Sequence, residues 1–212
     1  MSKVTMGHKS RFKIQRRLGV ELPGLGKPGA LDRRDYGPGQ HGQGMRRKLS
    51  DFAIRLREKQ KILYNYGLRE RQLRLIVKRS KSDRTKEWIE VMAGMLELRL
   101  DSVVFRLGFA PSLAAARQMV VHRNVLVNGS KRTIPSMVLK VGDRVSLTPT
   151  GYKSAPFLQA RSNPRMDMPD HLGKIVEAGN PVGIVNDVPG SEAIPFPFEK
   201  RYFIEHFGRI SL

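Results

Sequence analysis

The chain contains no cysteine, one tryptophan and no long apolar run. The lack of cysteine excludes a disulfide framework, a thiolate nucleophile and any zinc site built on sulfur ligands. No stretch approaches the roughly 18 apolar residues of a membrane span, and charges interrupt the first ten residues, where a signal peptide needs an apolar segment. We therefore expect a cytoplasmic protein with no membrane partner.

Positive charge is what the sequence has in abundance. Lysine and arginine number 39 against 19 aspartate and glutamate residues, which gives a net charge of +20 over 212 residues. Segments 1–50, 51–97 and 98–150 carry +9, +5 and +6, whereas 151–212 is neutral. This surplus indicates a polyanionic partner that meets the first 150 residues. A merely solvated basic face is the alternative, but solubility does not require three consecutive segments with the same bias.

The composition and the periodicity of the sequence change at residue 50. Residues 1–50 are rich in glycine and cations and show little periodicity, which predicts an extended arm that orders on its partner. Ser50 is a suitable N-cap for a helix that ends at Tyr66-Gly67. Apolar spacing predicts further helices over 68–78 and 85–99.

Shorter elements follow. We expect Asp101 to cap a helix over 102–107, and Pro111-Ser112 to open another through residue 121. The pair Asn128-Gly129 predicts a hairpin between strands at 125–127 and 131–134, followed by strands at 137–141 and 144–147. The aromatic residues at 196–212 predict a terminal amphipathic helix or strand that packs back onto another lobe.

Several short motifs resemble catalytic or ligand-binding sites, but the residues around them do not support those functions. Gly37 to Gly42 has the letters of a dinucleotide-binding loop, but no apolar strand precedes it and Pro38 removes a backbone donor. The five histidines lie far apart, and Asp167, Asp170 and His171 beside two prolines are typical of a surface turn. The sequence therefore predicts no catalytic residue, no metal site and no cofactor.

The candidate binding residues are mostly arginines, whose planar group grips phosphate in a bidentate manner. The first predicted patch contains Arg16, Arg17, Arg46, Arg47, Lys48, Arg55, Arg57, Lys59, Lys61, Arg69 and Arg71, with Gln40 and His41 in the glycine-rich loop. The second contains Arg106, Arg117, His122, Arg123, Asn128, Lys131 and Arg132. Aromatic residues are few and fall mostly on apolar stripes, which favours recognition of a folded RNA backbone over stacking on unpaired bases.

Ordered motifs in both halves resemble small-subunit ribosomal protein S-four, a family of bacterial type, in a form without zinc. In the first half they are Gly39-Gln40-His41-Gly42, Leu49-Ser50-Asp51-Phe52, Leu56-Arg57-Glu58-Lys59-Gln60-Lys61, Tyr66-Gly67 and Glu70-Arg71-Gln72. In the second half Leu100-Asp101-Ser102-Val103-Val104-Phe105-Arg106-Leu107-Gly108-Phe109, Ala116-Arg117-Gln118, Val121-His122 and Val127-Asn128-Gly129 resemble the RNA-binding module of that family. Ser10 to Lys13 stands where many relatives carry the first Cys-x-x-Cys of a zinc knuckle.

The resemblance implies an α+β fold. In it, a mostly helical lobe over 51–97 is joined by 195–212, and a helix-helix-hairpin RNA-binding module over 98–160 packs short helices on a small antiparallel sheet. An extended basic arm over 1–50 precedes the lobe, and a neutral proline-rich connection with short strands spans 161–194. The implied function is a primary assembly protein for the five-prime domain of small-subunit ribosomal RNA. Contacts with neighbouring proteins number five and number three, messenger RNA near the entry channel, translational accuracy and repression of its own messenger are also implied.

Two other functions remain possible from the residues. Some pseudouridine synthases begin with the same module, and Arg99-Leu100-Asp101 echoes the surroundings of their catalytic aspartate. However, the 62 residues after residue 150 are too few for their catalytic domain. A free-standing RNA chaperone is opposed by the additional arm and helical lobe. The ribosome, cytoplasmic or organellar, is the expected location.

Overall fold

The structure, a computed structural model, describes residues 10–32, 34–43 and 49–208. The helices are α1 (Arg11–Leu18), η1 (Pro23–Leu25), α2 (Asp51–Asn65), α3 (Glu70–Ser82), α4 (Trp88–Glu97), α5 (Leu100–Arg106), α6 (Leu113–Val121), α7 (Pro149–Tyr152), α8 (Ala155–Ser162), η2 (Ser191–Ala193) and α9 (Lys200–Gly208). The strands are β1 (Val125–Val127), β2 (Ser130–Lys131), β3 (Arg144–Leu147), β4 (Leu172–Glu177) and β5 (Asn180–Val185). The α+β class predicted from the sequence is confirmed.

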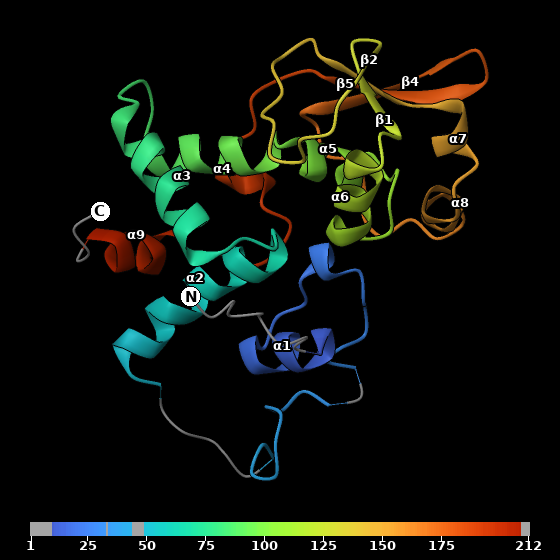
Figure 1. Cartoon of the computed structure of the whole chain (residues 1–212). Coiled ribbons are helices and arrows are strands. Elements are labelled where there is room, and N and C mark those ends of the chain that lie inside the picture. Colours follow the sequence, from blue (N-terminus) through green and yellow to red (C-terminus); the bar gives the residue numbers. More distant parts are fainter. Residues whose placement is uncertain (1–9, 33, 44–48, 209–212) are drawn as a thin grey trace, which may run out of the picture.

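Helices α2, α3, α4 and α9 form one side of the molecule (Figure 1). The Ser50 hydroxyl accepts a hydrogen bond from the Ala53 amide at 3.3 Å, so α2 begins at the predicted cap. Helix α9, from the end of the chain, packs on α2 with Phe203 and Phe207 fully buried. The ring centroids of Phe203 and of Trp88 in α4 lie 6.2 Å apart, and this aromatic contact joins α9 to the lobe that begins at residue 51.

The sheet forms the other side, with α5 to α8 beneath it (Figure 1). Its antiparallel strands lie in the order β2-β1-β3-β5-β4. Asn128 and Gly129 have φ values of 50° and 77°, the left-handed pair that a two-residue hairpin turn requires. The predicted hairpin is thus confirmed, although β2 is shorter than expected.

Two predicted details of this part are wrong. Residues 137–141 form no strand, because their backbone pairs with the chain between α4 and α5. The Leu139 amide donates to the Leu98 carbonyl, and the Leu100 amide to the Met137 carbonyl, both at 2.8 Å. Strand β5 occupies the place beside β3 instead. Asp101 does not cap α5 either, since Arg99 is the N-cap residue and Asp101 lies within the first turn.

The part of segment 1–50 that the structure describes is less extended than predicted. Helix α1 buries Ile14 and Leu18, and Leu22 follows on the same four-residue spacing. The Gly24 amide donates to the Asn65 side chain at 2.9 Å, so η1 is anchored on the end of α2. The apolar stripe is short and diluted by cations, which is why the sequence pattern alone did not reveal it.

Gly183 in β5 has no room for a side chain. A Cβ atom there would lie 2.1 Å from Cδ1 of Leu107, which is itself 1% exposed. We expect Gly183→Ala to lower the free energy of unfolding by about 1 to 3 kcal/mol through overpacking, measured by urea denaturation. Gly37→Ala is the control, because a Cβ atom at residue 37 meets nothing within 4 Å. Equal midpoints for the two variants would contradict the prediction.

Candidate nucleic-acid interface

A fully buried carboxylate, Asp101, lies at the junction of the two parts. It accepts hydrogen bonds from Arg99 Nε at 3.0 Å, from Arg99 Nη2 at 2.8 Å and from Arg117 Nε at 2.7 Å. Its exposed fraction is 0%, so these two guanidinium groups replace the water that the carboxylate loses on burial. Asp101 therefore holds the fold together.

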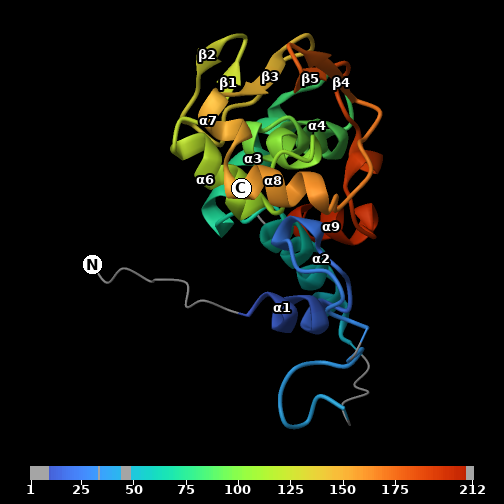
Figure 2. The same cartoon turned by 90° about the vertical axis from the view of Figure 1, so that its right-hand side faces the viewer.

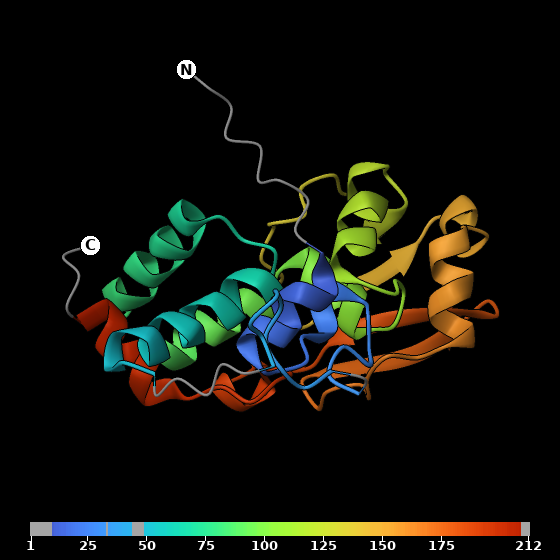
Figure 3. The same ribbon diagram turned by 90° about the horizontal axis from the view of Figure 1, so that it is seen from below.

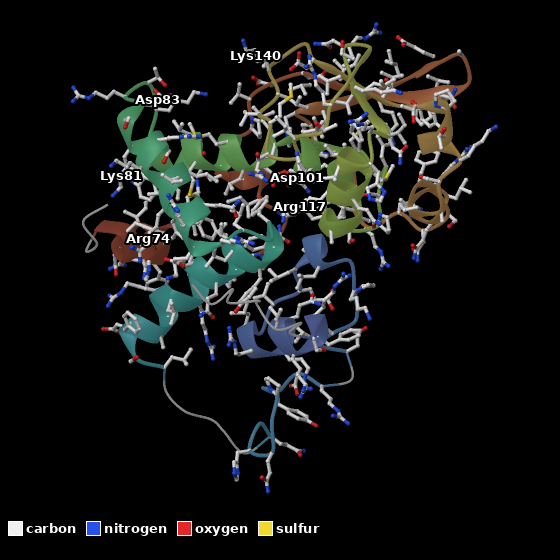
Figure 4. All side chains as sticks on the ribbon, in the orientation of Figure 1. Arg74, Lys81, Asp83, Asp101, Arg117 and Lys140 are labelled. Atoms are coloured by element: carbon white, nitrogen blue, oxygen red, sulfur yellow. The ribbon has the colours of Figure 1, made fainter. Side chains whose placement is uncertain are left out.

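Arg117 extends this junction from α6 to the turn before α3. Its Nη1 donates to the Gly67 carbonyl at 2.7 Å and its Nη2 to the Tyr66 carbonyl at 2.5 Å. Figure 4 shows the Asp101 and Arg117 side chains next to each other, where α6 approaches the helical lobe. The planar group of Arg117 is thus occupied by three intramolecular acceptors. The sequence assigned it to phosphate, whereas its geometry makes it a brace between α6 and α3.

Arg106 and Lys61 are also internal, against the sequence-based expectation of surface contacts. Arg106 is 8% exposed, donates to Glu97 at 2.9 Å and also contacts the Ala193 carbonyl. Burial raises the pKa of Glu97, and Arg106 opposes that rise. Lys61 is 7% exposed and donates to Glu58 at 2.6 Å and to the Pro197 carbonyl at 3.0 Å. Both cations would have to leave buried partners to reach a phosphate, so we exclude them from the interface.

Three further predicted cations have partners on the protein surface. Arg55 pairs with Glu205 at 3.4 Å and Lys59 with Glu70 at 3.2 Å, with each cationic side chain 12% exposed. Arg16 donates to the Tyr36 carbonyl at 3.0 Å and to the Gly37 carbonyl at 3.2 Å. Arg16 therefore positions the glycine-rich loop on α1.

The glycine-rich loop and α1 border a hollow of about 660 Å³ that Arg17 and Arg57 also line. Arg17 is exposed and donates to the side chains of Gln60 and Tyr64, at 3.0 and 3.1 Å. Gln40 and His41 are exposed at the tip of the loop. The predicted residues Arg46, Arg47 and Lys48 lie outside the described residues.

The other predicted residues gather on the surface around α6. The exposed members are Arg69, Arg71, His122, Arg123, Asn128, Lys131 and Arg132. Because Arg117 ties α6 to the turn before α3, the structure brings the start of α3 beside the second predicted patch. Figure 2 shows α6 and the β1–β2 hairpin on the same side of the molecule. We call these seven residues the α6 face.

Two members of the α6 face have unusual local geometry. Arg123 follows the C-cap of α6 with φ 61°, a left-handed conformation in which helices usually place glycine. Asn128 uses its side chain within the sheet, donating to Asp143 at 2.8 Å and accepting from the Arg144 amide at 2.9 Å. Asn128 thus fixes the hairpin that presents Lys131 and Arg132.

Helix α3 adds cations that the sequence analysis missed. Arg74 and Lys78 are exposed and follow Arg71 by three and seven residues, so they continue its face of the helix. The spacing of these cations along the predicted helix was a signal in the sequence that could have identified them. The Glu70 carboxylate pairs with Arg74 at 3.3 Å, as its position four residues earlier predicts.

Within the described ranges, no three histidine, aspartate or glutamate side chains are grouped to hold a metal ion. In the same ranges, no helix has the length and apolar character needed to cross a membrane.

Comparisons with known proteins cover both parts of the chain. Residues 7–97 match the ribosomal protein S4/S9 N-terminal domain, and residues 98–145 match the S4 domain. Small ribosomal subunit protein uS4B of Bdellovibrio bacteriovorus is 48% identical over 201 residues, which cover 95% of this chain and 96% of the relative. Small ribosomal subunit protein uS4 of Methylobacillus flagellatus is 39% identical, over 93% of this chain and 95% of the relative. The two domain matches in this order, together with relatives matched over nearly their whole length, show that the chain belongs to the ribosomal protein S4 family.

Proposed function

We propose that this chain is a structural, non-enzymatic constituent of the small ribosomal subunit that binds the subunit's RNA. The observation that carries the proposal is the α6 face, where cations at the start of α3, after the end of α6 and in or next to the β1–β2 hairpin are all exposed. Relatives similar over the whole chain are named small ribosomal subunit proteins. The location that follows is the ribosome.

The proposed RNA target is the five-prime domain of small-subunit ribosomal RNA, bound early in assembly. Neighbouring proteins number five and number three, messenger RNA near the entry channel and a role in translational accuracy belong to the same proposal. They rest on the resemblance of the sequence motifs to the family.

The protein contributes a rigid set of charges. The buried ion pairs of Asp101 fix α5, α6 and the turn before α3 relative to one another, and the sheet fixes the hairpin. Cations held at fixed spacing fit one arrangement of phosphates better than others, so the backbone of a folded RNA is read by its shape. A flexible polycation would lack this selectivity.

A substitution at Arg123 is expected to affect RNA binding without lowering the stability of the fold. We expect Arg123→Gly to maintain the free energy of unfolding or raise it by about 1 kcal/mol, because glycine adopts φ 61° without strain. The same change should weaken RNA binding and reduce the salt dependence of the binding constant by roughly one phosphate contact. Urea denaturation and filter binding measure the two effects. Weakened binding accompanied by a loss of stability would contradict this assignment.

The proposed target is tested by hydroxyl-radical footprinting on the isolated five-prime RNA domain. We compare charge reversal at Arg69, Arg71 and Arg74 with charge reversal at Arg123, Lys131 and Arg132. Each triple variant should lose protection at a different set of nucleotides while the other set persists. Binding of the unaltered chain with equal affinity to an unrelated RNA of the same length would overturn the proposal.

A further inference from the structure

Two adjoining hollows lie along the segment that leads into η2. The first, about 620 Å³, opens between α4 and this segment, with Val138 at its edge. The second, about 650 Å³, lies between the same segment and residues 167–171. Val188, Pro189, Gly190 and Glu192 line both, so the two hollows adjoin along this segment. We call the pair of hollows the 188–192 groove.

The groove is acidic in a strongly basic chain. Six of the 19 acidic residues line it, namely Asp83, Glu90, Asp167, Asp170, Asp187 and Glu192, whereas its cationic lining in the described structure consists of Lys86 and Arg106. Arg106 is already engaged by Glu97 and the Ala193 carbonyl. In the described part of the chain, Asp167, Asp170, Asp187 and Glu192 form no salt bridge. The groove therefore presents carboxylates that lack a cation.

The groove also offers apolar surface and a buried polar group without a partner. Val138 and Val188 are 50% and 47% exposed, and Val91, Met95 and Leu98 line the first hollow with Val138. His171 lines the second hollow and is 7% exposed, and its Nε2 atom is buried without a hydrogen-bond partner in the described structure. Burial, with Arg106 nearby, lowers the pKa of His171 to about 4, so the ring is neutral at pH 7. An unpaired buried nitrogen is costly unless a ligand satisfies it.

The position of the groove separates it from the RNA-binding surface. In Figures 2 and 3 the segment that leads into α9 and helix α6 lie on opposite sides of the molecule. Carboxylates repel phosphate, so the groove is unsuited to RNA. Unpaired carboxylates beside exposed apolar side chains, spread over two adjoining hollows, complement an extended polypeptide with lysine or arginine side chains between apolar ones.

We propose that the 188–192 groove is the docking site for a basic, extended segment of another protein in the small subunit. This inference rests on the proposed function, which places the chain in that particle with its cationic side on RNA. The acidic groove faces away and binds the partner's cations through Asp167, Asp170, Asp187 and Glu192. Its valines hold the partner's apolar side chains.

Photocross-linking from residue 188 in assembled small subunits tests the proposal. A benzophenone amino acid replaces Val188, which lines both hollows, and mass spectrometry identifies the cross-linked product. We expect a segment of another ribosomal protein that contains at least two lysine or arginine residues. Cross-links to RNA, to a segment without cations or to nothing would overturn the proposal.

Charge variants separate docking from folding and from RNA binding. Asp170→Asn with Glu192→Gln keeps the shapes of the side chains, and Asp170→Lys with Glu192→Lys reverses their charge. The cross-link yield should fall about threefold in the first and at least tenfold in the second, while affinity for the isolated RNA stays within twofold. Glu177→Lys, a reversal on β4, should leave the yield unchanged. An unchanged yield in the double reversal would refute docking through carboxylates, whereas failure of the unaltered chain to bind RNA would refute the proposed function itself.

Discussion

Replacing Asp101 with alanine is expected to lower the free energy of unfolding by about 3 to 5 kcal/mol. The change removes the acceptor for Arg99 and Arg117 and leaves two guanidinium groups facing a site that is 0% exposed. Removing one member of a buried ion pair costs more than the pair contributes, because the remaining charge loses its compensation. Urea denaturation followed by circular dichroism measures the loss.

The matched control for Asp101 is Glu177→Ala. Glu177 pairs with Arg144 on the surface, where both side chains are about half exposed, and an exposed pair contributes at most about 1 kcal/mol. If Asp101→Ala lowers the free energy of unfolding no more than Glu177→Ala does, the junction does not depend on the Asp101 carboxylate. Because Arg117 loses one of its three acceptors in the Asp101 variant, we also expect weaker RNA binding through misplacement of α6.

The affinity for the five-prime RNA domain is expected to fall by roughly 10³ to 10⁵ between 50 and 200 mM salt, if about 6 to 10 phosphates are contacted as on duplex DNA. The described structure offers Arg17, Arg69, Arg71, Arg123, Lys131 and Arg132 as exposed predicted cations. Each contact releases bound counterions, and this release becomes less favourable as salt rises. Filter binding at several salt concentrations gives the slope.

A triple variant tests whether the slope originates on the α6 face. Changing Arg123, Lys131 and Arg132 to glutamine should reduce the slope by about 3, since each neutralised contact contributes about 0.9. Lys86→Gln is the control, because Lys86 lines the 188–192 groove. A slope that stays the same in the triple variant would remove the α6 face from the interface.

Local chemistry made part of the fold predictable. Ser50 and Ser112 cap helices at the predicted places, each accepting from the amide three residues later. Asn128-Gly129 produces its hairpin because both residues take left-handed conformations there. These signals require only neighbouring residues, so a single sequence contains them.

Contacts between distant residues could not be predicted in the same way. Strand β5 displaced the expected strand at 137–141 because that segment pairs with the backbone of Leu98 and Leu100, which no periodicity encodes. Likewise, Lys61 and Arg106 look like surface cations until Pro197 and Ala193 from the end of the chain cover them. The sequence reveals the net charge of a candidate site, but the choice of free cations depends on the folded neighbours.

The packing of α9 on α2 has a consequence for synthesis. Helix α2 leaves the ribosome early in translation with its binding surface for α9 uncovered, and α9 arrives only after strands β1 to β5 have been made. Domains mature during translation as soon as their residues are available. The sheet-containing part is therefore the first to be complete in the nascent chain, although the helical lobe is the first to begin.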